Sequence, residues 1–261
     1  MFLTLPAFKR RTNAAGIHFG LSLVIAVLAG LLVFGIWYPH PYREISGGRE
    51  LFVLVVAVDV IMGPLMTFVV FNVAKPRGEL FRDLTIIGLV QAAALAYGLW
   101  TVAVARPVHL IFEVDRFRVV HAIEVPAELL SQALPDLQRL PLTGPTLLSI
   151  REFKDSNEGF ESIMAELQGA AVSFRPNMWQ SYAKAKPQVI ARAKPLNELK
   201  DRFPERIDEV EAALASSSLT TKAKRGASVG YIPVVGHNSF WTVLIDIKTA
   251  DIIAFVPIDS F

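Results

Sequence analysis

Three apolar runs, all before residue 107, constrain the fold of this chain more than any other feature of its sequence. They cover residues 14–38, 51–72 and 84–105, and each is long enough to cross a hydrocarbon core about 30 Å thick, which takes about 20 residues. The chain of 261 residues is also 52% hydrophobic, a high share for a water-soluble protein. We therefore predict a membrane protein whose residues 14–106 form three transmembrane α-helices, the first of them an uncleaved anchor.

The basic residues that flank the three runs predict the orientation of the chain, because cytoplasmic loops are enriched in Lys and Arg. One side of the membrane would carry six of them: Lys9, Arg10, Arg11, Lys75, Arg77 and Arg82. The other side would carry three: Arg43, Arg49 and Arg106. This asymmetry predicts a cytoplasmic tail at residues 1–13 and places residues 107–261 outside the cytoplasm, as a periplasmic domain.

Residues 107–261 read as one soluble α+β domain with an antiparallel sheet. Alternating apolar residues on either side of Asp115-Arg116 predict a β-hairpin, and "WTVLIDIKTADIIAFVPI" predicts two more strands around a turn. The stretches "AELLSQAL", "GFESIMAEL" and "PLNELKDRFPERIDEVEAALA" predict helices between these strands. Residues 220–228 are polar and basic, as is typical of a loop.

Asp59 is the most unusual residue of the predicted membrane region, because a carboxylate in hydrocarbon costs about 2.5–3.5 kcal/mol and normally faces other helices. At a rise of about 1.5 Å per residue, Asp59 lies roughly 12 Å below the outer surface, Tyr97 roughly 12–14 Å, and Gln91 about 9 Å deeper than Tyr97. We therefore expect Tyr97 to be the direct partner of a protonated or hydrogen-bonded Asp59, with Gln91 reached through water or a tilt. Three roles stay open for Asp59: a polar clasp between helices, a contact for another transmembrane helix, and an ion relay, which a single ionisable group disfavours.

Two further patterns in the predicted spans concern helix shape and helix contact. Gly63-Pro64 removes a backbone hydrogen bond, so we expect a bend one turn after Asp59. Gly16 and Gly20 have the small-xxx-small spacing of a helix-contact face, although glycine is common in membrane helices.

The sequence lacks the residue patterns of the common classes of enzyme. It contains no cysteine and no G-x-S-x-G, P-loop, G-x-G-x-x-G or H-E-x-x-H motif, so we expect no catalytic residues, cofactor or metal. The five histidines are scattered, and we expect His109 and His121 to form a surface pair across the hairpin rather than a metal site. The net charge of +2 gives no indication of nucleic-acid binding.

Five strings, taken in their order and spacing, resemble the TfpX/TfpZ family of type IV pilin accessory proteins: "GIHFGLSLVIA", "WYPHPYREISGGRELF", "VDVIMGPLMTFVVFN", "RDLTIIGLVQAAALAYGLWTVAVARPV" and "FEVDRFRVV". The resemblance is dense over residues 16–122 and returns in "SFRPNMWQSY" and "WTVLIDIKTADIIAFVPID". It implies a multi-pass protein of the bacterial inner membrane whose partners are the lipid bilayer, a type IV pilin and inner-membrane pilus assembly proteins. It implies no reaction and assigns no roles to Asp59, Gly63, Pro64, Gln91 or Tyr97.

These observations favour a membrane-bound chaperone or assembly adaptor that acts on a pilin by binding. Two alternatives stay open. A pilin-modifying membrane enzyme is disfavoured by the missing acidic metal-binding cluster, and a periplasmic sensor is disfavoured by the short cytoplasmic segments.

Overall fold

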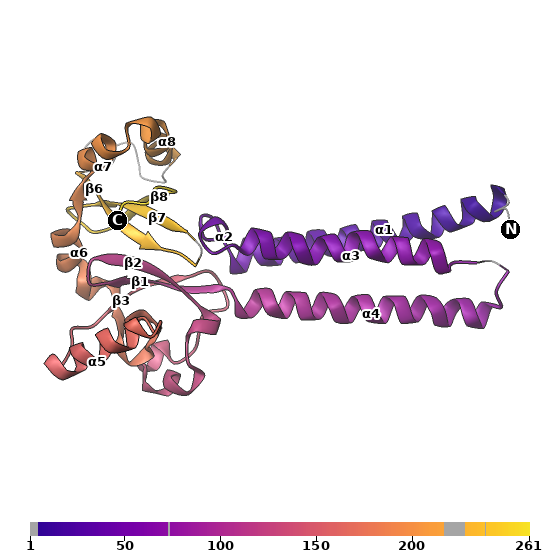
Figure 1. The fold of residues 1–261 in the computed structure, drawn as a ribbon, viewed down its shortest axis with the longest axis horizontal. Coiled ribbons are helices and arrows are strands. Elements are labelled where there is room, and N and C mark those ends of the chain that lie inside the picture. Colours follow the sequence, from indigo (N-terminus) through magenta and orange to yellow (C-terminus); the bar gives the residue numbers. More distant parts are fainter. Residues whose placement is uncertain (1–4, 73, 217–227, 238) are drawn as a thin grey trace. The chain divides into compact units, whose positions relative to one another are not determined.

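The computed structural model describes residues 5–72, 74–216, 228–237 and 239–261. The chain divides into two compact units (Figure 1). The first comprises residues 1–43 and 47–105 and is helical, whereas the second comprises residues 44–46 and 106–261 and contains the sheet.

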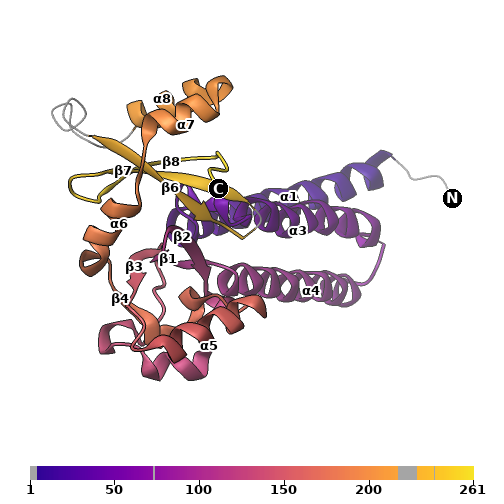
Figure 2. The same ribbon diagram turned by 60° about the vertical axis from the view of Figure 1, so that its left-hand side comes forward.

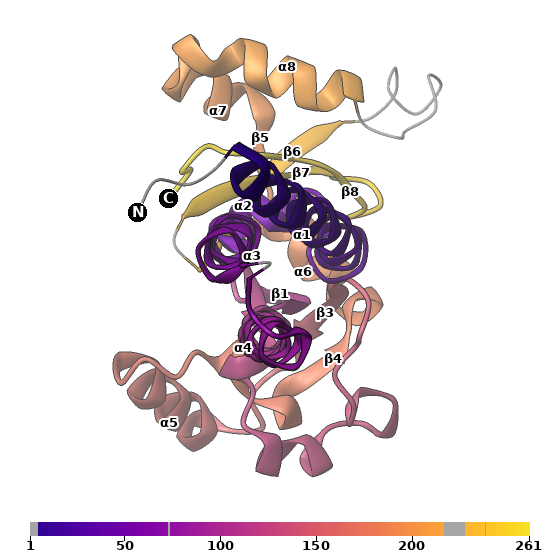
Figure 3. The same ribbon diagram turned by 90° about the vertical axis from the view of Figure 1, so that its right-hand side faces the viewer.

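The helical unit contains three long helices that run side by side when viewed end-on in Figure 3. They are α1 (Leu5–Leu32), which continues as a π-helical turn (Val33–Trp37), α3 (Gly48–Val70) and α4 (Arg77–Val104), with the short helix α2 (Tyr42–Ile45) between α1 and α3 in the chain. α3 packs against both α1 and α4. All three are long and apolar enough to cross a membrane, so the prediction of three apolar helices is confirmed. α1 and α4 begin earlier than the predicted spans, because a helix can continue through polar turns that lie outside hydrocarbon.

Tyr38, next to the π-helical turn, closes one end of the helical unit. Its side chain is fully buried with Val33 and Val102, and its hydroxyl donates a hydrogen bond of 3.1 Å to the carbonyl of Val102 in α4. A Cβ atom at Gly48 would overlap with the ring of Tyr38, so the glycine that begins α3 makes room for this packing.

The second unit is built on an eight-stranded sheet with the order β4-β3-β1-β2-β6-β7-β8, in which β5 also pairs with β6. The strands are β1 (Pro107–Glu113), β2 (Arg116–His121), β3 (Thr146–Ile150), β4 (Trp179–Ser181), β5 (Lys194–Pro195), β6 (Val229–Val235), β7 (Phe240–Asp246) and β8 (Ile252–Val256). β1 pairs with β3 and β2 pairs with β6 in parallel, so the predicted antiparallel sheet is wrong and the sheet is mixed. The two predicted hairpins are antiparallel, but long connections join the parallel pairs, as parallel strands require.

Two apolar cores lie along this sheet. One gathers side chains of β1 to β4 around Ile111 and Trp179, and the other gathers side chains of β6 to β8 around Leu244. Helices α7 (Leu196–Arg202) and α8 (Ile207–Ser216) contact the β6–β8 part, as Figure 2 shows. The two parts of the sheet join through only two register pairs between β2 and β6, Phe117 with Val234 and Arg118 with Val235.

The remaining predicted helices form in part. Residues of "GFESIMAEL" lie in α5 (Ser156–Leu167), whose N-terminus is capped by Asp155, and α6 (Lys186–Arg192) follows β4. "AELLSQAL" forms a 3-10 helix (Ala127–Gln132) and not an α-helix. The predicted loop at 220–228 lies outside the described residues except for Ser228.

Candidate functional site

Asp59 of α3 is paired with Gln91 of α4. The Gln91 Nε2 atom donates hydrogen bonds to Asp59 Oδ1, at 3.1 Å, and to the Asp59 carbonyl oxygen, at 3.2 Å. The structure therefore brings together two of the predicted residues and overturns the preference for Tyr97. The Tyr97 side chain is 69% exposed and stacks at a tilt on Trp100, with ring centroids 5.8 Å apart.

The preference for Tyr97 failed because it used depth along the helix and ignored rotation around it. At about 100° per residue, Gln91 and Gly98 share one face of α4, whereas Tyr97 is turned about 100° away from Gly98. Gly98 contacts α3, since a Cβ atom at that position would lie 2.6 Å from Val55 Cγ1. The face of α4 that carries Gln91 is thus the face that packs on α3.

Gly63 is the residue that admits the Gln91 side chain to α3. A Cβ atom at position 63 would overlap with Gln91 Nε2. Pro64, which has no N–H for the carbonyl of Val60, follows directly inside α3, and the helix continues through it from Gly48 to Val70. Small residues that let helices approach closely are typical of membrane helix pairs, and here they place a polar amide against a carboxyl group.

An apolar groove of about 470 Å³ lies between α3 and α4 and contains the Asp59–Gln91 pair. Its lining residues from α3 include Leu54, Val58 and Met62, and those from α4 include Ala94 and Tyr97. Val58 and Met62 are each 50% exposed, so the groove is open at its rim. Such a surface can hold another apolar helix and offer it one polar contact.

Gly63→Ala should weaken the α3–α4 contact, because the added methyl group must displace the Gln91 amide from Asp59. We expect a loss of about 0.6–1.7 kcal/mol in the free energy of unfolding, the range measured for hydrogen bonds between membrane helices. Denaturation of the full chain in detergent micelles measures it. Gly88→Ala is the matched control, since a Cβ at this exposed position of α4 meets no described atom within 4 Å.

The Gly63→Ala effect should also depend on Gln91. In a background of Gln91→Ala, the extra methyl group has no amide to displace, so the double variant should lose little more than Gln91→Ala alone. Strictly additive losses would contradict the assignment of Gly63 as the residue that makes room for Gln91.

A second polar contact between the long apolar helices, which the sequence did not reveal, joins α1 to α3. The Nδ1 atom of His18 lies 2.5 Å from Thr67 Oγ1, and Thr67 is almost fully buried. A single histidine and a single threonine form no recognisable spacing, so no sequence signal could have paired them.

Gly16 and Gly20, the predicted helix-contact face, are exposed on α1. A Cβ atom at either position would meet nothing within 4 Å in the described part of the chain, so the two glycines make room for no described neighbour. A contact between this face and another chain stays a prediction.

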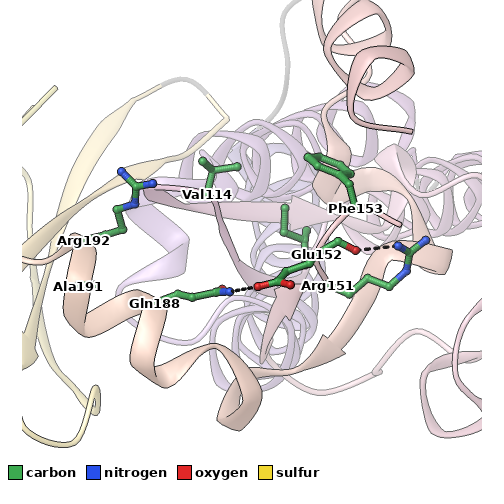
Figure 4. A pocket seen from close by; sticks show the side chains of 8 residues that line it. Val114, Arg151, Glu152, Phe153, Gln188, Ala191 and Arg192 are labelled. Carbon is green, nitrogen blue, oxygen red and sulfur yellow. Dashed lines mark hydrogen bonds between the residues drawn. The ribbon is translucent and has the colours of Figure 1, made fainter. Parts of the chain in front are cut away.

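The sheet unit has a pocket of about 510 Å³ beside β3 and α6 (Figure 4). Val114, Phe153 and Arg192 lie on its rim, and Gln188 donates a hydrogen bond of 2.9 Å to Glu152 across it. Arg151, also in the lining, forms a two-point ion pair with Glu158, which holds the pKa of Glu158 down at about 2. Glu152 and Arg151 are therefore already paired with other side chains. The pocket is a surface hollow with partly apolar walls.

His109 and His121 do not form the predicted surface pair. His109 is opposite Val120 in the β1–β2 register, and both histidines are buried. A surface pair needs one solvated face of the hairpin, but all seven residues of β1 are buried, so both faces of this strand are covered.

Comparison with known proteins gives full-length relatives. The chain is 35% identical to the fimbrial assembly protein of serogroup I from Dichelobacter nodosus and 33% identical to that of serogroup E1, in each case over 97% of both chains. It is 40% identical to the protein of serogroups C1 and C2 from the same organism over 48% of this chain and 96% of the relative. The family model described as fimbrial assembly protein FimB matches residues 6–47. No solved structure matches the chain.

Proposed function

Because this chain belongs to the fimbrial assembly protein family, we propose that it supports pilus assembly, and specifically the assembly or surface display of a type IV pilin in the bacterial inner membrane. Fimbrial assembly is in the names of its full-length relatives, and the finer assignment to a type IV pilin rests on the sequence resemblance to the TfpX/TfpZ family. The chain acts by binding and not by catalysis.

The α3–α4 groove carries this proposal. Its walls are apolar side chains, and its polar content centres on Asp59 and Gln91, one carboxyl group and one amide that already bond to each other. An apolar helix can bury its surface there while the Asp59 carboxyl group keeps its hydrogen bond to Gln91, and a carboxyl group left without a hydrogen-bond partner is costly in hydrocarbon. The occupant that we propose is the membrane helix of a pilin before assembly, which is both apolar and helical.

The orientation follows from the basic residues that flank the helices, which favour a cytoplasmic N-terminus and a periplasmic sheet unit. A membrane bundle and a periplasmic domain in one chain can contact both parts of a membrane-held pilin. Alkaline phosphatase fused after Phe261 should therefore be active, and a reporter that works only in the cytoplasm should be inactive.

A photo-crosslinking amino acid at Val58 should form an adduct with pilin in intact membranes, because Val58 lines the groove and is 50% exposed. Val53 is the matched control. It is the same residue type on the same helix, 57% exposed, and turned about 140° from Val58, on the face away from the groove. Adducts of equal yield at both positions would mean that the groove has no special role, and pilin adducts at Val53 alone would move the docking surface to the other face of α3.

A further inference from the structure

Three potential metal ligands meet where β2 ends and the β6–β7 turn begins. His121 is the last residue of β2, Glu124 ends the 3-10 turn that follows, and His237 lies in the β6–β7 turn. One ligand atom from each lies within 4.8 Å of the other two. The His121 Nδ1 atom is 3.0 Å from Glu124 Oε2, and the His237 Nδ1 atom is 3.8 Å from Glu124 Oε1.

The three side chains do not satisfy one another's hydrogen-bonding capacity. His121 is 3% exposed, and its Nε2 atom is buried without a partner among the residues that the structure describes. This atom calls for a water molecule of its own, because the Nδ1 atom on the other side of the same ring is the one that faces Glu124. Beside the cluster lies a pocket of about 360 Å³ that Glu124 and His237 line, which gives an ion a path and room for a water ligand.

Glu124 is held in place by hydrogen bonds. Its Oε2 atom accepts hydrogen bonds from the backbone N–H of His121, at 2.8 Å, and from the ring of His121. Arg118, the nearby cation in the pocket, is already paired with Glu113 at 2.7 Å.

We propose that His121, Glu124 and His237 bind one zinc ion, with water as the fourth ligand. Two imidazoles and a carboxylate form a donor set that zinc accepts in tetrahedral sites. Zinc–ligand bonds of about 2.1 Å at tetrahedral angles separate ligand atoms by about 3.4 Å. The three candidate ligand atoms lie within 4.8 Å of one another, so side-chain rotations that draw them closer complete the site.

The position of the site indicates what the ion does. It joins the end of β2 to the β6–β7 turn, and thus the two parts of a sheet that share only two register pairs at this seam. Each part has its own apolar core, and apart from this seam the Tyr182 hydroxyl donates a hydrogen bond of 2.6 Å to the Ala250 carbonyl across the two parts. A metal ion that binds only the folded state contributes its binding free energy to that state, and here it would hold the two halves together.

The test uses the full chain without a polyhistidine tag, purified in detergent, stripped with a chelator and titrated with zinc alone. We expect one ion per chain and a rise in the Tm of the sheet unit. His237→Ala should lower the affinity for zinc by at least about 100-fold and remove the rise in Tm. Loss of a residue that only supports a ligand already lowers metal affinity by up to about 100-fold, and loss of a ligand should cost at least as much. Because the His237 side chain is 55% exposed, this variant should still fold.

Two carboxamide variants complete the experiment. Glu124→Gln should weaken zinc binding as His237→Ala does, whereas Glu128→Gln, an exposed acid four residues later, should leave it unchanged. Wild-type protein that binds zinc no more tightly than both site variants would overturn the proposal. The outcome is independent of pilin docking, because neither the groove residues nor a pilin takes part in it.

Discussion

A strain that lacks this chain should carry far fewer surface pili than its parent, while most of its pilin remains in the inner membrane. The loss follows if unassembled pilin depends on the α3–α4 groove to cover its apolar helix. The deletion removes the docking site altogether, so we expect surface pili to fall by at least about tenfold, the change that a loss of about 1.4 kcal/mol in docking free energy would cause. Electron microscopy counts the pili, and immunoblots of membrane fractions measure total pilin.

Two variants separate a docking role from a general need for the protein. Val58→Trp fills the groove, whereas Val53→Trp adds the same bulk on the opposite face of α3. Complementation with Val53→Trp should restore pili, and complementation with Val58→Trp should not. The mass of the pilin should be unchanged in the deletion strain; an altered mass would point to a pilin-modifying enzyme, and pilus counts that track an external signal would point to a sensor.

The three long apolar helices could be predicted because hydrocarbon thickness imposes a length of apolar sequence that few soluble helices have. The partner of Asp59 could not be predicted from that length alone. Depth along the helix ranked Tyr97 above Gln91, but the rotation of α4 placed Gln91 on the face toward α3. The spacing of Gln91 and Gly98, seven residues apart, was the signal that identifies this face.

Local sequence patterns predicted only those strand pairs of the sheet that are neighbours in the chain. Both hairpins are contiguous in sequence and appear in the structure, whereas the parallel pairs β1–β3 and β2–β6 join strands far apart in the chain. No alternation marks β6, which also contains Pro233 between its short pairings with β5 and β2. From sequence alone, a proline argues against assigning its segment to an interior strand, so β6 could not be predicted.

The same limit applies to the two histidines of the hairpin. We expected His109 on the surface of the hairpin, but it is buried, as is every other residue of β1. The proposed zinc ligands are His121, Glu124 and His237. The pairing of β2 with β6 brings His237 close to His121 and Glu124. Sequence spacing could reveal the first two of these ligands and not the third.

Acid should destabilise the sheet unit through His109, by about 3 kcal/mol between pH 7 and pH 4. Burial lowers the pKa of His109 to about 4, against 6.5 for an exposed histidine. The unfolded chain therefore takes up a proton first as the pH falls below 6.5, and stability declines until the folded state is protonated near pH 4. The ring is fixed by Thr146, whose Oγ1 atom is 2.6 Å from His109 Nδ1, and by the indole of Trp179.

His109→Asn isolates this effect, because asparagine keeps a polar group near Thr146 but does not titrate. Carboxyl groups such as Glu113, whose pKa is raised by burial, contribute equally to both proteins and cancel in the difference. The free energy of unfolding, measured by denaturant at several pH values, should fall more steeply for the wild type by about 3 kcal/mol in total. An NMR titration of the His109 ring in the wild-type chain needs no variant, and a midpoint near 6.5 would show that the folded protein leaves this histidine free to ionise.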